Sequence, residues 1–315
     1  MKNQGSPSPH STNGLDGTRL TKHQPVTPST ASSSPVDAVE NKQSVKKDDC
    51  GSEAKTKPFD ICTPKQSGGA VALKPSLFAK NREKRKEMNQ SGKEIVFLRP
   101  GMVHLKGYIS ITDQIKIVKV CRELGLGDGG FYQPGYEDGT KLHLKMMCLG
   151  KNWDPQTSKY VDQRPSDGSV PPKIPPEFLT LVHSALEDSH AVTKLSNSKQ
   201  PFTFSPDICI VNFYSLNGQL GLHKDKDESK ESLDAGLPVV SFSIGNSAEF
   251  LYRDEMEVEA KKVVLESGDV LIFGGKARNV FHGVSAIKPD TAPSSLINET
   301  NLRKPGRLNL TFRQY

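Results

Sequence analysis

With 315 residues and a net charge of +6, the chain has room for one sizeable domain plus appendages, because one hydrophobic core usually serves about 100 to 250 residues. It contains no run of about 18 apolar residues and no apolar signal core, so the sequence favours a soluble protein without a membrane span. Its five cysteines are scattered and form no Cys-x-x-Cys pair, which argues against a zinc knuckle and a disulfide framework and favours the nucleus or the cytoplasm.

Residues 1–94 differ in composition from the rest of the chain. Up to about Ser67, polar residues and proline dominate and aromatic residues are few, so this stretch cannot bury enough apolar surface to offset the entropy of ordering. We expect residues 1–94 to form a disordered, mildly basic extension, since they hold 16 Lys or Arg against 10 Asp or Glu, whereas the remainder holds 26 of each. A short helix is expected at 75–88. Its basic cluster suits a nuclear import signal, a nucleic-acid contact or simply a solvated linker helix; the cluster comprises Arg82, Lys84, Arg85 and Lys86.

A folded domain is expected at residues 95–315. Residues 95–109 break into short apolar segments punctuated by proline and glycine, which is typical of strands and turns. Residues 110–125 carry a helical apolar stripe between capping residues and a glycine, and a second amphipathic helix is predicted at 176–187. The stretch around Trp153, between the two helices, is expected to be rich in loops.

From residue 207 onward the pattern changes to about seven short β-like segments separated by turn residues. Such a series indicates a β-sandwich or a jelly roll. The expected class is therefore α+β, mainly β, with a double-stranded β-helix (jelly-roll) core, supporting helices and a disordered N-terminal tail before it.

A candidate metal site begins in the segment Gly-Leu-His-Lys-Asp-Lys-Asp. The period of two in an extended chain places His223, Asp225 and Asp227 on one face. His282 follows a strand-and-turn segment and is placed to return across a barrel to the same site. Two imidazoles and a carboxylate are typical of the facial triad of non-haem Fe(II) oxygenases, although zinc hydrolases use the same ligands. The ligands alone leave iron and zinc open.

The last predicted strand, Arg-Leu-Asn-Leu-Thr-Phe-Arg, alternates in polarity. Arg307, Asn309, Thr311 and Arg313 share one face, and the other face is apolar. A buried guanidinium requires a carboxylate partner, and a dicarboxylate co-substrate supplies one. This favours iron over zinc. In the alternative interpretation, both arginines pair with acidic side chains at an edge strand.

Three segments together resemble the AlkB family of Fe(II)/2-oxoglutarate dioxygenases: Asn-Phe-Tyr followed by His-Lys-Asp-Lys-Asp-Glu, then Ser-Gly-Asp-Val-Leu-Ile-Phe-Gly-Gly followed by histidine, then Arg-Leu-Asn-Leu-Thr-Phe-Arg-Gln. The likeness covers about residues 95–315. It implies that the catalytic iron ligands are His223, Asp225 and His282. It also assigns to 2-oxoglutarate the residues Asn212, Tyr214, Arg307, Asn309 and Arg313. In this assignment Arg307 holds the distal carboxylate and Arg313 supports the other end of the co-substrate.

The resemblance further implies a pocket for a flipped methylated base. Trp153 and Tyr160 match its aromatic residues, and Asp227 matches the acceptor for the exocyclic amine of the base. Core packing of Trp153 and a solvated Asp227 stay open as alternatives. Some members of the family supply a basic contact to the base from the segment that matches residues 252–261. Here that segment offers Arg253 and Lys261 with mostly acidic residues between them, so the resemblance assigns neither to this role.

We therefore expect oxidative demethylation of N-methylated bases in DNA or RNA, such as N6-methyladenine, 1-methyladenine or 3-methylcytosine. The expected cofactor is Fe(II), with 2-oxoglutarate and O2 as co-substrates and formaldehyde, succinate and CO2 as products. The expected partner is DNA or RNA and not a membrane, and the protein is expected to be a monomer. Two alternatives are the same chemistry on a protein or small N-methylated substrate, and a catalytically silent nucleic-acid-binding module.

Overall fold

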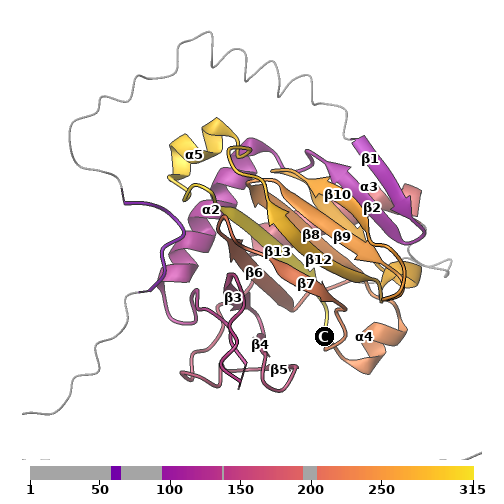
Figure 1. The fold of residues 1–315 in the computed structure, drawn as a ribbon, viewed down its shortest axis with the longest axis horizontal. Helices are drawn as coiled ribbons and strands as arrows, with labels where there is room; N and C mark the ends of the chain where they lie inside the picture. Colours follow the sequence, from indigo (N-terminus) through magenta and orange to yellow (C-terminus); the bar gives the residue numbers. More distant parts are fainter. Residues whose placement is uncertain (1–57, 65–93, 137, 194–203) are drawn as a thin grey trace, which may run out of the picture. The chain divides into compact units, whose positions relative to one another are not determined.

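The computed structural model describes residues 58–64, 94–136, 138–193 and 204–315 (Figure 1). Two antiparallel sheets form its core. The larger contains, in spatial order, β1 (Glu94–Arg99), β2 (Met102–Lys106), β11 (Val270–Phe273), β8 (Val239–Gly245), β13 (Arg307–Arg313), β6 (Ile208–Tyr214) and β3 (Lys145–Leu149). The smaller contains β10 (Lys261–Leu265), β9 (Ala248–Arg253), β12 (Phe281–Ile287) and β7 (Leu220–His223).

The two sheets pack face to face. Phe250 and Tyr252 of the smaller sheet join one buried cluster with Val239, Leu271 and Phe273 of the larger sheet. Inner side chains alternate with outer ones along each strand, as the pleat requires. The expected mainly β class with a jelly-roll core is confirmed.

Helices cover the outer face of the larger sheet (Figure 1). They are α2 (Ile111–Leu126), α3 (Pro176–Thr193) and α5 (Ser294–Thr300). Their apolar residues enter one cluster with the strand side chains that point outward, among them Val118 of α2, Val182 of α3 and Leu310 of β13. Ser110 caps α2 by accepting a hydrogen bond from the backbone N–H of Asp113. Both predicted helices are thus confirmed, and the second extends further than expected.

The stretch around Trp153 is rich in loops, as predicted, but it also contains strands that were not predicted. It contains β3, an edge strand of the larger sheet, and a separate hairpin of β4 (Asn152–Asp154) and β5 (Lys159–Val161). The sequence of β3, Lys-Met-Met-Cys-Leu, has neither β-branched residues nor alternation, so its pattern gave no strand signal. The short helix α4 (Lys230–Asp234) was also not predicted.

Residues 58–64 are a second departure, because they were assigned to the disordered extension. Ile61 and Cys62 are buried, and Cys62 forms a bridge to Leu302. The ring of Phe59 lies against Phe213, with 5.5 Å between centroids. Three apolar side chains in an otherwise polar stretch explain why this segment packs against the domain. Residues 1–57 and 65–93 of the expected disordered extension, with the predicted helix at 75–88, lie outside the described residues.

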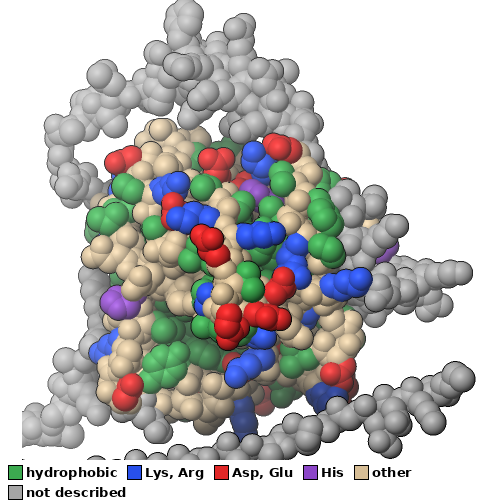
Figure 2. Space-filling view, turned by 45° about the vertical axis from the view of Figure 1, so that its right-hand side comes forward, with side chains coloured by type: hydrophobic (Ala, Val, Ile, Leu, Met, Phe, Trp, Pro, Cys, Tyr) green, Lys and Arg blue, Asp and Glu red, His purple; other side chains and the backbone are tan. Residues whose placement is uncertain are grey.

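Charged side chains of both signs are interspersed on the face shown in Figure 2, with hydrophobic side chains between them. This agrees with the balanced charge of the sequence after residue 94. In the described part of the chain, no helix is both long and apolar enough to cross a bilayer.

Candidate active site

A cavity of about 480 Å³ opens between the two sheets. It is lined by the inner face of β13, by β6, by β7 and the segment after it, by β12 and by the β4–β5 hairpin. The residues assigned from the sequence to the metal, to 2-oxoglutarate and to the aromatic and carboxylate part of the base pocket all line this cavity: Asn212, Tyr214, His223, Asp225, Asp227, His282, Arg307, Asn309, Arg313, Trp153 and Tyr160. The structure therefore brings together residues that are up to 160 positions apart in the chain.

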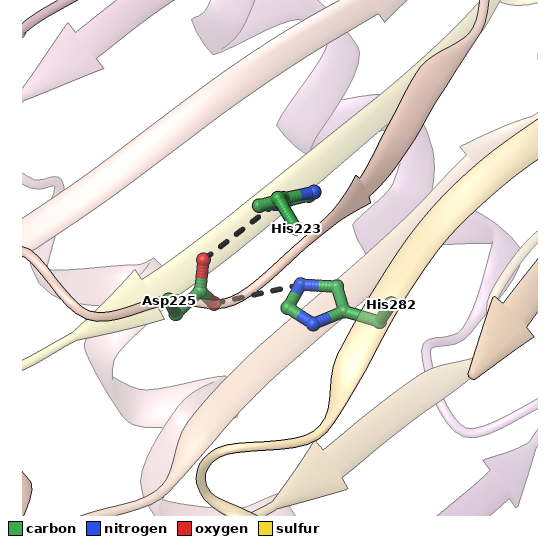
Figure 3. A group of neighbouring side chains, drawn as sticks. All are labelled: His223, Asp225 and His282. Carbon is green, nitrogen blue, oxygen red and sulfur yellow. Dashed lines mark ion pairs between the residues drawn. The ribbon is translucent and has the colours of Figure 1, made fainter. Parts of the chain in front are cut away.

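The two histidines face each other across a pair of strands. His223 ends β7, and His282 lies directly opposite it in β12. Each imidazole Nε2 is 3.7 Å from a different carboxylate oxygen of Asp225 (Figure 3), and the three ligand atoms lie within 4.8 Å of one another. The Nδ1 atoms lie 2.9 Å from the carbonyl of Gly221 and 3.2 Å from that of Val280. With Nδ1–H donating to these carbonyls, both Nε2 lone pairs point to the space between the three residues.

The electrostatics of this group suit a divalent cation. Burial lowers the pKa of His282 to about 4, so its imidazole is neutral and able to act as a ligand. Burial alone would raise the pKa of Asp225, but the guanidinium of Arg313 and both imidazoles hold it well below its usual range. Oδ2 of Asp225 is buried and has no hydrogen-bond partner among the described residues. A buried carboxylate oxygen without a partner beside two imidazole Nε2 atoms fits a metal ion.

A buried charge network lies behind Asp225 and was not predicted. Arg313 Nη2 donates to Asp225 Oδ1 at 2.7 Å, and its Nε is 3.1 Å from a carboxylate oxygen of Glu228. Arg278 donates to the other oxygen of Glu228 at 2.8 Å and to the backbone carbonyl of Asp225 at 2.6 Å. All four side chains are less than about a tenth exposed. The network fixes the orientation of Asp225, and only the run of acidic residues around it hinted at this in the sequence.

The environment of Arg307 is different. Its side chain is 1% exposed, and its partners are neutral: the hydroxyl of Ser243 at 2.8 Å and the carbonyls of Asn246 at 3.2 Å and Leu265 at 3.4 Å. No described carboxylate forms an ion pair with it, and its Nε has no hydrogen-bond partner there. Burial consequently lowers the pKa of Arg307 to about 10. Asp269 acts on Arg307 only electrostatically and forms no ion pair with it, and a buried cation without a paired carboxylate favours an anionic ligand.

Two more polar groups without partners surround Arg307. Tyr214 lies opposite Arg307 in the pairing of β6 with β13, and Asn212 lies opposite Asn309. The hydroxyl of Tyr214 and Oδ1 of Asn212 are buried and have no hydrogen-bond partner among the described residues. Burial raises the pKa of Tyr214 to about 12, so its hydroxyl remains a donor. Asn309 differs, because its amide already donates to Ser241 and to the carbonyl of Phe242.

The sequence left two interpretations of the arginines open: binding of a dicarboxylate co-substrate, or pairing with acidic side chains at an edge strand. The structure favours a different interpretation for each arginine. β13 lies between β8 and β6, so it is not an edge strand. Arg313 nevertheless pairs with acidic side chains, whereas Arg307 does not. The predicted role of Arg313 at the other end of the co-substrate stays a prediction, and its Nη1, which has no described hydrogen-bond partner, is the atom free for it.

The predicted base pocket lies at the hairpin. Trp153 and Tyr160 are cross-strand partners in β4 and β5, and the indole Nε1–H donates to Oδ2 of Asp227 at 2.8 Å. Both rings are partly buried against the apolar lining of the cavity. Arg253 and Lys261, the basic residues of the segment left unassigned in the sequence, do not line this cavity but a separate one of about 240 Å³. The β9–β10 hairpin carries them away from the metal ligands.

Comparisons with known proteins agree with this geometry. Residues 101–313 match the family model described as the 2OG-Fe(II) oxygenase superfamily. The protein of Arabidopsis thaliana named DNA N(6)-methyladenine demethylase ALKBH1C is 56% identical over 292 residues, which cover 89% of this chain and 62% of that protein. The AlkB homolog of Caulobacter vibrioides, named an alpha-ketoglutarate-dependent dioxygenase, is 34% identical over 221 residues, which cover 68% of this chain and 88% of that protein.

A solved structure, described as the structure of OsALKBH1, is 56% identical with a TM-score of 0.65 and covers 70% of this chain and 100% of its own. The chain spans only 59% to 65% of the length of three Arabidopsis thaliana relatives. The superfamily brings Fe(II) as the metal and 2-oxoglutarate and O2 as co-substrates, which agrees with the His-Asp-His group and the unpaired Arg307. The chain therefore belongs to the 2OG-Fe(II) oxygenase superfamily and, within it, to the AlkB family.

Proposed function

We propose that this chain removes methyl groups oxidatively from N-methylated bases in DNA or RNA. One observation carries the proposal: a single cavity contains an unpaired buried cation, a three-residue metal group and an aromatic side chain tied to a carboxylate. The first suits the dicarboxylate co-substrate, the second suits Fe(II), and the third suits a base with an amino group. The name of the 56% identical relative, a DNA N(6)-methyladenine demethylase, supports the same reaction.

At the co-substrate end, Arg307 pairs with the distal carboxylate of 2-oxoglutarate. The ligand thereby supplies the counter-charge that the described protein residues do not provide, and Tyr214 and Asn212 gain the hydrogen-bond partners they lack. Arg313 acts through Asp225, because its hydrogen bond to Oδ1 leaves Oδ2 for the metal.

At the metal group, His223, Asp225 and His282 would hold Fe(II). Bound Fe(II), with 2-oxoglutarate and O2, supplies the oxidation of the N-methyl carbon, which leaves as formaldehyde while succinate and CO2 form. The side chain of His223 is 37% exposed, against 9% for His282, so the substrate approaches from the side of His223. His223 is then placed both to bind the metal and to stack against the base.

At the base end, Trp153 stacks on the flipped base, with Tyr160 beside it, and Asp227 accepts a hydrogen bond from the exocyclic amine. This chemistry suits N6-methyladenine, 1-methyladenine and 3-methylcytosine, all of which carry such a nitrogen. We assign the activity to the domain of residues 95–315, acting as a monomer in the nucleus or the cytoplasm.

The first experiment separates an enzyme from a silent binding module. The purified full chain is incubated with Fe(II), 2-oxoglutarate and methylated oligonucleotide, and succinate is measured against a His223→Ala variant. We expect release from the wild type and only background from the variant. Equal background in both would contradict the enzymatic proposal.

The second experiment tests the substrate class. Methylated DNA, methylated RNA and methylated peptide are incubated in parallel, and loss of methyl is followed by mass spectrometry. We expect loss from at least one nucleic acid and none from the peptide. Loss from the peptide alone would replace the proposal with protein demethylation.

A further inference from the structure

The β4–β5 hairpin belongs to neither main sheet. Figure 1 shows it next to β3, away from the helices that cover the core. Its turn is closed by its own residues, because Asp154 accepts hydrogen bonds from Thr157 at 2.6 Å and from the backbone of Gln156 at 3.2 Å. Such a hairpin requires contacts with its surroundings to hold a fixed orientation.

Trp153 makes the connection to the metal-binding segment. Its indole donates to Asp227, two residues after the metal ligand Asp225, and its backbone N–H lies 3.5 Å from the sulfur of Cys148. Among the described residues, the indole–carboxylate bond is the one hydrogen bond between the β4–β5 hairpin and residues 220–229. The acceptor is an ionisable carboxylate, and such bonds are stronger than those between neutral groups.

This bond also determines where the indole ring lies relative to the metal ligands. Asp225 and Asp227 lie in the segment after β7, and both line the cavity. Oδ2 of Asp227 accepts from the indole, which leaves Oδ1 for a substrate. The carboxylate of Asp227 thus contacts the indole ring of Trp153 through Oδ2 and is available to the cavity through Oδ1.

We propose that Asp227 is a positioning residue that holds Trp153 in the orientation required for stacking on the base, and so couples the base platform to the metal-binding segment. The inference extends the proposed function and depends on it for the identity of the base. The hydrogen bond itself can be tested without any substrate.

Trp153 is the only tryptophan of the chain, so the intrinsic tryptophan fluorescence of the full-length protein reports on this one ring. We expect Asp227→Ala to lower the fluorescence anisotropy and to shift the emission maximum, because the indole loses its anchor. Asp227→Asn keeps an acceptor oxygen and is expected to retain most of the wild-type signal. Asp162→Ala is the matched control, because this carboxylate lies just after the hairpin, is exposed and pairs with Lys151 rather than with the indole.

An Asp227→Ala variant with wild-type anisotropy and emission would overturn the proposal. So would an equal change in Asp162→Ala. If Asp227→Ala does not fold, Asp227→Glu provides the same test, because one added methylene displaces the acceptor and is expected to alter the signal.

A double-mutant cycle then tests the effect on substrate binding. Trp153→Phe keeps an aromatic ring but lacks the indole donor. For a methylated oligonucleotide, each single variant is expected to raise KM about tenfold and to change kcat less, since a hydrogen bond to a charged group has about this effect. The double variant is expected to be little worse than the worse single variant, because both remove the same bond.

If the increase in KM of the double variant equals the product of the increases in the two single variants, Asp227 and Trp153 act independently and the proposed coupling between them is wrong. If the wild-type protein demethylates no oligonucleotide at all, the proposed function fails, whereas the fluorescence result still decides whether Asp227 positions Trp153.

Discussion

Arg307 and Arg313 occupy the two ends of one strand and share its inner face, yet their surroundings are opposite. Arg313 is enclosed by carboxylates, since Asp225 and Glu228 both contact it. Arg307 is equally buried but contacts only neutral groups. Their pKa values reflect this difference: burial lowers that of Arg307 to about 10, whereas for Arg313 the two carboxylates outweigh burial and hold its pKa above the ordinary value.

The difference indicates that Arg313 stabilises the folded protein, whereas Arg307 is available to bind a ligand. A buried cation that already has its counter-charges stabilises the structure around it, and here it fixes a metal ligand. A buried cation without counter-charges destabilises the free protein and is neutralised only when an anion binds. The comparison therefore supports the proposed placement of the ligand carboxylate at the Arg307 end.

Loss of Asp225 is expected to have the largest effect, because it removes both a metal ligand and a partner of Arg313. Asp225→Ala should abolish detectable Mn(II) binding in isothermal titration calorimetry and reduce succinate formation to background. Asp234→Ala is the control, since Asp234 is exposed and pairs only with Lys230. Unchanged Mn(II) affinity in Asp225→Ala would show that the three residues do not form the metal site.

Removing the paired cation is expected to destabilise the fold. Arg313→Met leaves two buried carboxylates without a counter-charge, and the expected loss is about 3–5 kcal/mol in the free energy of unfolding. Urea denaturation of the metal-free protein measures it. A loss below about 1 kcal/mol would mean that Glu228 and Asp225 find other partners, such as Arg278.

Removing Arg307, the unpaired cation, should weaken ligand binding without lowering the stability of the fold. Arg307→Met is expected to weaken 2-oxoglutarate binding about 100-fold, because a buried charge pair is lost. The metal-free protein should be as stable as the wild type or more so, since an unpaired buried charge disappears. Arg307→Lys, which keeps the charge but not the two-pronged geometry, should lie between wild type and Arg307→Met in affinity. Equal losses of stability in Arg307→Met and Arg313→Met would contradict the view that only Arg313 has a structural role.

The sequence was sufficient to predict that both arginines face one cavity but not which of them has partners. Alternation in β13 and the pair His223-x-Asp225 are local patterns with a period of two, and His282 was predicted from its place after a strand-and-turn segment. The partners of Arg313 come from a loop about 85 residues earlier, and Arg278 in a turn pairs with the same Glu228; only the folded chain brings these residues together. Likewise, the bond between Trp153 and Asp227 spans 74 positions, which no spacing rule connects.

The smallest predicted effect on stability concerns the ion pair of Arg122 with Asp60, which lies near the surface where the segment 58–64 joins the domain. Both oxygens of Asp60 accept hydrogen bonds from Arg122, at 2.9 and 2.7 Å. Asp60→Asn keeps the shape of the side chain but removes the charge, so it should lower the free energy of unfolding by about 1 kcal/mol or less, as is usual for a solvent-accessible pair.

The pH dependence of this loss distinguishes a charge effect from a packing effect. The hydrogen bonds from Arg122 hold the pKa of Asp60 below its ordinary value of 3.8 in the folded chain. The unfolded chain therefore takes up the proton first as the pH falls, and the stabilisation is present above that value and lost as the pH falls through the folded pKa. Urea denaturation of the wild type and Asp60→Asn should give a constant difference from pH 7 to about pH 5 and a shrinking one below about pH 4. A difference that persists at low pH would assign the docking of residues 58–64 to Phe59 and Ile61 instead of the ion pair.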